Sequence, residues 1–291
     1  MTETDSSGPQ PGPNNQAASG QATSDPTTRD PATEDSDQGY DKREVFGWKM
    51  YDWAWSAFST TVGTALLGPY LLALAEDNGG VSFLGWNIDA GSFFPFVVSL
   101  SAITQVLVLP IIGAIADHTD HKKRLMMSMA FFASGFTMAM FFIVSSTVLL
   151  GGLLFILASI GFAAAGVVYN SYLPEIAQPD QRDRVSAAGF AYGYLGGGLW
   201  LAINLAMVVL VEDTALAVRL SLGLTGLWAA LFFGFPQRLI RKRPASRTKP
   251  SEKGWLSFSV SSVLATGKEM AQKYPVAVSY THLTLPTTPY V

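Results

Sequence analysis

Few polar side chains interrupt the long apolar runs of this chain, and they are the first candidates for chemistry. A carboxylate, amide or guanidinium in hydrocarbon is costly, so it is usually kept to bond helices together, to pair with an opposite charge or to bind a solute. Among those that the runs contain or border, we predict five to contact a substrate: Asp52, Gln105, Asn170, Asn204 and Arg219.

Each of these residues also has a structural alternative. Asp52 could equally accept hydrogen bonds from backbone N–H groups at a helix start. For Gln105 a hydrogen bond between helices is favoured over substrate contact, and Asn170 and Asn204 share that ambiguity. Arg219 could extend to the membrane interface, or it could face a cavity and meet a carboxylate or phosphate. We favour the cavity.

Several other chemistries lack the residues they need. The chain has no cysteine, which excludes disulfides, thiolate metal ligands and a cysteine nucleophile, and three histidines are too few for a usual zinc site. The spans contain no Ser-His or paired-Asp arrangement, and the glycines at 193 and 196–198 follow no strand, as a phosphate-binding loop would. We therefore expect no enzymatic activity, no cofactor, no metal and no nucleic-acid partner.

The apolar runs have the length of membrane-spanning helices. At about 1.5 Å per residue, each can cross about 30 Å of hydrocarbon, and none alternates in polarity as a barrel strand would. The composition agrees, with 49% hydrophobic and 14% charged residues and a mean hydropathy of +0.27. The predicted fold class is an all-α polytopic membrane protein, with six spans at residues 53–75, 93–116, 125–145, 148–169, 187–211 and 215–235.

Basic residues give the direction of these spans. Of the 19 Lys and Arg, all but Arg219 lie before the first span, between the second and third, between the fourth and fifth, or after the sixth. Cytoplasmic loops accumulate Lys and Arg, so we predict a cytoplasmic N-terminus and an external loop at 76–92. The basic segment after the sixth span is expected to lie against an anionic inner leaflet. A bacterial inner membrane is the expected location.

The chain divides into four parts by composition. Residues 1–45 form a polar tail that is expected to be disordered, residues 46–236 the six-helix unit, and residues 237–273 a cytoplasmic loop. Residues 274–291 begin like a seventh span but continue as SYTHLTLPTTPYV. That string resembles adapter DNA read as coding sequence at the ends of conceptual translations, so we expect a truncated span with a non-native tail.

The loop after the second span resembles a known signature. It reads GAIADHTDHKKR over residues 113–124, similar to the loop between spans two and three of the major facilitator superfamily. That resemblance implies a gate at the inner helix ends, in which we expect Asp117 to hold neighbouring helices together through Arg182, Arg184 or a helix terminus. The predicted gating residues are Gly113, Asp117, Lys122, Arg124, Arg182 and Arg184.

Three further stretches narrow the resemblance. The first span opens with YDWAWSAFSTT from Tyr51, the fourth ends with YNSYLPEI from Tyr169, and the fifth opens with DRVS from Asp183, followed by GFAYGYLGGG from Gly189. Together they resemble the vacuole-effluxer-like (Atg22-like) branch of the superfamily. That branch usually has Asn where this chain has Trp55, which therefore joins the candidate substrate contacts.

The resemblance implies a twelve-span secondary transporter of two six-helix halves that works by alternating access. Its implied partners are the lipid bilayer, a small-molecule substrate, protons as a candidate coupling ion, and a C-terminal six-helix half missing from this chain. The expected activity is outward movement of a small solute, with an amino acid as the leading candidate. The alternative is a non-transporting six-span scaffold or a homo-oligomeric subunit.

Overall fold

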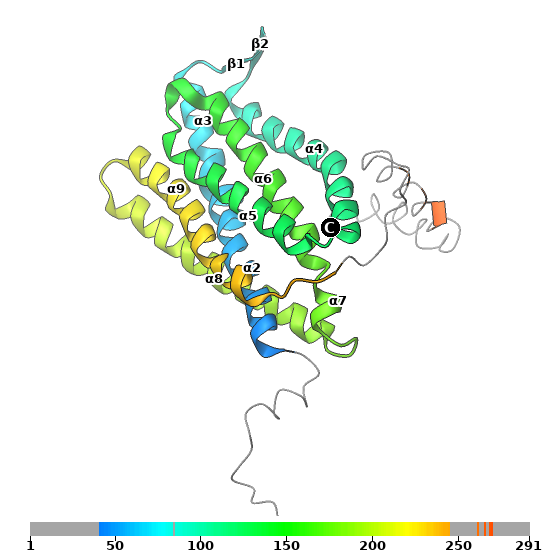
Figure 1. The fold of residues 1–291 in the computed structure, drawn as a ribbon. Coiled ribbons are helices and arrows are strands. Elements are labelled where there is room, and N and C mark those ends of the chain that lie inside the picture. Colours follow the sequence, from blue (N-terminus) through cyan, green and yellow to red (C-terminus); the bar gives the residue numbers. More distant parts are fainter. Residues whose placement is uncertain (1–40, 84, 245–260, 262–264, 266–267, 270–291) are drawn as a thin grey trace, which may run out of the picture. The chain divides into compact units, whose positions relative to one another are not determined.

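The computed structural model describes residues 41–83, 85–244, 261, 265, 268 and 269, and within them it confirms the predicted six-span α-helical fold. Six helices of the described part are long and apolar enough to cross a membrane: Lys42–Asp77, Ala90–His118, Lys122–Phe142, Ser145–Ile176, Arg182–Leu210 and Thr214–Leu239. Figure 1 shows them side by side, connected mainly by short turns.

The first span is one long helix with an irregular centre. It consists of α2 (Lys42–Ala57), the π-helix η1 (Phe58–Leu66) and α3 (Leu67–Asp77). The Asp41 side chain accepts hydrogen bonds from the backbone N–H groups of Arg43 and Glu44, so it caps the helix start. Wider π turns are rare and often lie at functional sites.

A short hairpin follows the first span, which the sequence did not predict. Strands β1 (Val81–Phe83) and β2 (Trp86–Ile88) pair antiparallel, with Val81 opposite Ile88. Gly80 makes the entry to the hairpin possible, because its φ of +108° is a conformation that residues with a side chain rarely adopt. We call this end of the bundle the hairpin end.

The second, third and fourth spans follow. They are α4 (Ala90–His118), α5 (Lys122–Ala139) with the 3₁₀ turn η2 (Met140–Phe142), and α6 (Val148–Asn170) after the turn η3 (Ser145–Thr147). In the described part, α6 is the most enclosed span, with 56% of its most apolar window buried. The same fraction is 11% for α4, which leaves that helix open to lipid or to a further protein surface.

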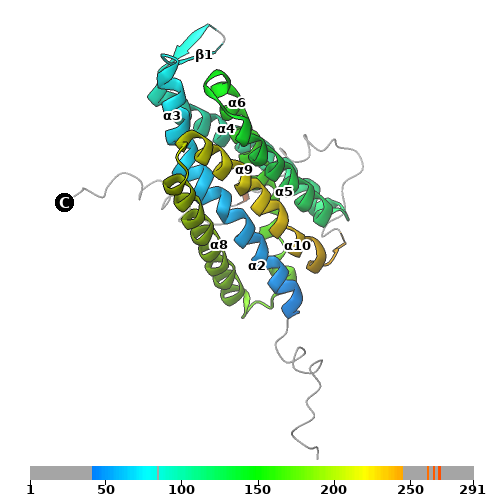
Figure 2. The same cartoon turned by 90° about the vertical axis from the view of Figure 1, so that its left-hand side faces the viewer.

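The fifth and sixth spans complete the bundle. The short helix α7 (Leu173–Ile176) leads to α8 (Arg182–Leu210), and α9 (Thr214–Phe232) continues into α10 (Gly234–Leu239). The most extensive contacts join α2 to α8, α5 to α6, α4 to α6 and α5 to α9. Figures 1 and 2 both show α8 and α9 running beside α2, so segments far apart in sequence meet here.

The helices extend past the predicted boundaries. Residues 42–45, assigned to the tail, are helical, and α10 takes residues 237–239 from the predicted loop. Both extensions are polar, and hydropathy alone does not detect a helix that continues beyond the hydrocarbon. The rest of the predicted tail, most of the loop at 237–273 and all of residues 274–291 lie outside the described residues.

Candidate functional site

Glycines allow α8 to lie directly against α2. A Cβ added at Gly196 would come within 2.7 Å of the Trp53 carbonyl oxygen, and one at Gly193 would lie 2.7 Å from Ser56 Oγ. Gly197 is similarly close to the backbone of Ser56, whereas Gly198 has no neighbour within 4 Å. Of the four glycines at 193 and 196–198, three form this contact, because the helical repeat turns Gly198 away.

Asp52 lies at this α2–α8 contact, held by an aromatic stack. Its side chain is 8% exposed, and Oδ2 accepts a hydrogen bond of 2.7 Å from the Tyr169 hydroxyl of α6. The rings of Trp48 and Tyr51 stack on the Tyr169 ring, with centroids 4.4 and 4.3 Å away. The Trp48 indole N–H also donates to the Tyr169 carbonyl oxygen at 3.2 Å. Asp52 therefore serves no helix start, since α2 begins ten residues earlier.

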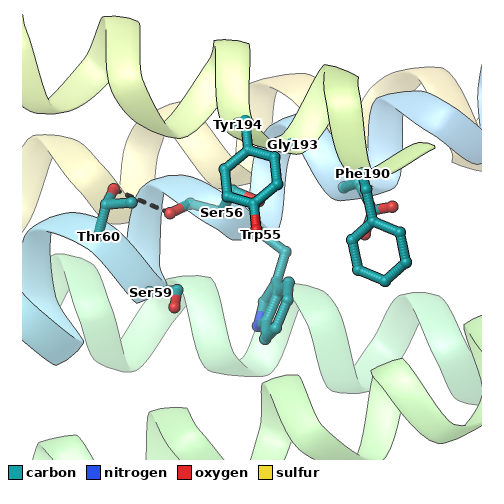
Figure 3. Close-up of a pocket in the computed structure, with 8 residues that line it drawn as sticks. Trp55, Ser56, Ser59, Thr60, Phe190, Gly193 and Tyr194 are labelled. Atoms are coloured by element: carbon teal, nitrogen blue, oxygen red, sulfur yellow. Dashed lines mark hydrogen bonds between the residues drawn. The ribbon is translucent and has the colours of Figure 1, made fainter. Parts of the chain in front are cut away.

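Two adjoining hollows open at Asp52, with volumes of about 210 and 340 Å³. Both are lined by Asp52, Trp55 and Phe190, so we treat them together and call them the α2–α8 site. Figure 3 shows the smaller hollow, where Trp55 from α2 and Phe190 from α8 extend to the same side. The smaller hollow is completed by Ser56, Ser59, Thr60, Gly193 and Tyr194.

The π-helix begins within this site. Ser59 and Thr60 of η1 line the smaller hollow, and the Thr60 hydroxyl lies 2.9 Å from the Ser56 carbonyl oxygen and 3.2 Å from that of Gly197 (Figure 3 draws the first contact). Thr60 therefore connects α8 to the point where the first span changes its winding. Hydroxyl groups and irregular helix at one hollow are features of a solute site within a bundle.

Three of the six predicted substrate contacts meet at the α2–α8 site. Asp52 and Trp55 line both hollows and Asn170 lines the larger one. Asn204 is fully buried instead, and its amide donates to Thr61 Oγ1 at 3.0 Å, so it joins two helices as its structural alternative predicted. Gln105 donates to Ser101 of its own helix at 3.0 Å and lines neither hollow.

The structure corrects the preference for a cavity-facing Arg219. Its Nε donates a 2.7 Å hydrogen bond to the Phe141 carbonyl oxygen, and its guanidinium lies 4.9 Å from the centre of the Phe141 ring. Phe141 belongs to η2, near the hairpin end of the bundle. A free carbonyl at the end of a helix attracts a cation, which explains why Arg219 lies there and not at the α2–α8 site.

The predicted gating residues lie at the opposite end of the bundle, which we call the basic end. Gly113 of α4 faces Val167 of α6, where an added Cβ would lie at an ordinary packing distance of 3.6 Å. Arg182 donates to the carbonyl oxygens of Ala177 and Pro174, at 3.3 and 3.2 Å, so it holds the end of α7. We expected Asp117 to pair with Arg182 or Arg184. Within residues 41–83 and 85–244, no hydrogen bond or ion pair joins Asp117 to either arginine.

Lys122 makes the strongest contact of this group. Its side chain is 2% exposed, and Nζ lies 2.5 Å from Glu175 Oε1 and 3.1 Å from the Ser171 carbonyl oxygen. The ammonium group also lies 4.6 Å from the centre of the Tyr172 ring. Arg124 and Arg184 are exposed. Lys122 therefore connects the start of α5 to the chain between α6 and α8.

The segment after the sixth span binds the same end of the bundle. Arg243 pairs with Glu44 at 2.8 Å, and the Arg241 backbone N–H donates to the same carboxylate at 2.9 Å. The Arg241 side chain also pairs with Asp41. These arginines, expected to face an anionic leaflet, instead neutralise carboxylates of the protein, of which Glu44 is only 3% exposed.

Several residues of the α2–α8 site and of the basic end were not predicted from the sequence. Tyr169, Phe190 and Tyr194 lie in the stretches that carry the family resemblance, but apolar neighbours gave no sign that they line a hollow. Glu44 lies in the predicted tail and Glu175 in a stretch that carries the family resemblance, and neither segment indicated an ion pair. Within the part of the chain that the structure describes, no cluster of three or more His, Cys, Asp or Glu could hold a metal ion.

Comparison with known proteins identifies a family that the chain matches. Residues 40–282 match the family model described as vacuole effluxer Atg22 like. The chain is 31% identical over 194 residues to the uncharacterized MFS-type transporter YxiO of Bacillus subtilis, covering 64% of this chain and 44% of that protein. It is 24% identical to autophagy-related protein 22-1 of Penicillium rubens over an alignment of 344 positions that covers 82% of this chain and 58% of that protein.

A third relative, autophagy-related protein 22 of Pyricularia oryzae, is 23% identical over an alignment of 321 positions that covers 81% of this chain and 47% of that protein. The chain thus spans about half the length of the curated relatives it matches. No solved structure matches it significantly.

Proposed function

Because the chain belongs to the vacuole effluxer Atg22-like family of the major facilitator superfamily, we propose that it is one half of a secondary active transporter. The complete protein would move a small solute, with an amino acid as the leading candidate, outward across the membrane by alternating access. The observation that carries this proposal is the α2–α8 site, where a single buried carboxylate, hydroxyl groups and aromatic rings meet inside a bundle of membrane spans.

A second six-helix half would supply the other wall of this site. Substrate sites of two-half transporters lie between the halves, and the Phe190 and Tyr194 side chains that line the smaller hollow are 63% and 81% exposed. Exposure of large rings beside a carboxylate fits a surface that a further protein segment covers. Protons are the proposed coupling ion, and Gly113, Asp117, Lys122, Arg124, Arg182 and Arg184 are the proposed inner gate.

Transport by the complete protein tests this function. We expect liposomes containing it to take up at least one member of a labelled amino-acid panel, and to exchange it against the same unlabelled solute inside. Trp55→Ala removes a ring that lines both hollows and should raise KM about tenfold, equivalent to about 1.4 kcal/mol. Trp86→Ala, in the hairpin, is the matched control and should leave KM unchanged. A complete protein that is folded but moves no solute would instead support a non-transporting membrane scaffold.

Orientation of the bundle is a separate prediction. We propose that the basic end is cytoplasmic, because cytoplasmic segments collect Lys and Arg. The chain has no native cysteine, so single cysteines can be placed at exposed Asp120 and at exposed Glu212 near the hairpin end. An impermeant thiol reagent added to intact cells should label Glu212→Cys and leave Asp120→Cys unlabelled. The reverse pattern would place the basic end outside.

A further inference from the structure

The lining of the α2–α8 site contains an acidic side chain and no basic one. Among the residues that line its two hollows, Asp52 is the one with a formal charge, and none is Lys, Arg or His. Within residues 41–83 and 85–244, no Lys or Arg makes an ion pair with Asp52. Lys49, one turn away on α2, lies over the Tyr192 ring at 5.4 Å instead. A solute that enters this site therefore meets a negative charge with no cation of the protein beside it.

Hydrogen-bond acceptors at the site remain available to a ligand. Asp52 receives the Tyr169 hydroxyl on Oδ2, and a Cβ at Gly189 would lie 2.9 Å from that same oxygen, so only a glycine there leaves it uncovered. Tyr51 lines the larger hollow, and its buried hydroxyl has no hydrogen-bond partner in the described part of the chain. A primary ammonium group carries three N–H donors and fits this arrangement.

The walls of the site favour the same chemistry. Trp48, Tyr51, Trp55, Tyr169, Phe190 and Tyr194 contribute rings to the two hollows. Aromatic faces attract cations, and the attraction grows when the cation is removed from water. They do not attract anions. A lone carboxylate within a membrane protein is costly until an opposite charge reaches it, so a bound cation would offset the cost of burying Asp52.

We propose that the α2–α8 site binds the ammonium group of an amine-bearing solute, with Asp52 as the counter-ion, Tyr51 Oη as a second acceptor and the surrounding rings as walls. The inference rests on the proposed transport function and adds the chemical class of solute to it. The ammonium group is required for recognition, whereas a solute carboxylate is not held by any cation of this site. The Tyr169 hydroxyl positions the Asp52 carboxylate and is not itself a contact of the ammonium group.

Binding to the purified complete protein tests this inference without relying on transport. The probes are phenylalanine, phenethylamine, N-acetylphenylalanine and 3-phenylpropionate, which keep one ring while changing the charged groups. Tryptophan fluorescence should report binding of phenethylamine and phenylalanine, and the two probes without an ammonium group should bind at least tenfold more weakly. Asp52→Asn should weaken phenethylamine binding at least tenfold, whereas Asp77→Asn, at an exposed carboxylate of the hairpin end, should leave it unchanged.

The outcomes separate the two proposals. Equal binding of N-acetylphenylalanine and phenylalanine, no binding of phenethylamine, or full binding by folded Asp52→Asn would overturn the ammonium site. Amine binding without transport of any solute would keep the site and reject the transporter. Tyr169→Phe keeps the ring stack and removes the hydroxyl, so it should weaken amine binding less than Asp52→Asn does. An equal or larger loss would make Tyr169 a direct contact.

Discussion

Glu175→Ala is expected to lower the free energy of unfolding by about 3 kcal/mol, because it leaves the buried ammonium group of Lys122 without its carboxylate partner. Lys122 is 2% exposed and its ion pair with Glu175 measures 2.5 Å, while Glu175 itself is 26% exposed. Removing one partner of a buried pair typically costs about 3 to 5 kcal/mol, and the partial exposure of Glu175 places the effect at the lower end. The Ser171 carbonyl and the Tyr172 ring remain as weaker partners.

Thermal unfolding of the complete protein in detergent measures this effect. Glu175→Ala should unfold at a clearly lower temperature than wild type. Glu76→Ala, at an exposed carboxylate of the hairpin end, should not. Lys122→Met combined with Glu175→Ala should recover part of the loss, since no buried charge is left unpaired. Identical unfolding temperatures for Glu175→Ala and Glu76→Ala would mean that the pair contributes nothing to stability.

The second large effect is expected from Gly196→Ala. The added methyl group would lie 2.7 Å from the Trp53 carbonyl oxygen and 2.7 Å from the Trp53 ring, so α8 must move away from α2. Backbone atoms cannot move aside as a flexible side chain can, and overpacking of this kind costs about 1 to 3 kcal/mol. Because residues of α2 and α8 line both hollows, transport should fall at least about tenfold, a loss of about 1.4 kcal/mol.

Gly198→Ala is the matched control, two residues along the same helix. A Cβ there meets nothing within 4 Å, and Ala is the better helix former by about 1 kcal/mol. We expect wild-type transport and unchanged or slightly higher stability from this variant. Liposome uptake at matched protein content measures both substitutions. Equal transport by the two variants would show that close approach of α2 and α8 is not needed for activity.

The ion pairs near the proposed inner gate could not be predicted from the sequence. The loop signature pointed to Asp117, yet it is Lys122 of the same loop that forms a buried ion pair, with Glu175. Glu175 follows the fourth span in the stretch YNSYLPEI, 53 residues from Lys122 along the chain. Nothing in either segment indicates that the two charges meet, because the meeting depends on how α5 and α6 pack. Glu44 and Arg243 are farther apart still, separated by 199 residues.

The sequence by itself determined the number of spans, their α-helical nature and the family. Hydrocarbon requires every backbone group to be bonded within its own segment, so a long apolar run leaves few alternatives to a helix. Tertiary structure alone decided which polar groups share a site. Asp52, Trp55 and Phe190 line one pair of hollows. Arg219 instead binds the Phe141 carbonyl oxygen near the hairpin end. The reason is physical: hydropathy records how each segment meets lipid, whereas a site depends on which helix faces approach one another, here through glycines that allow α8 to reach α2.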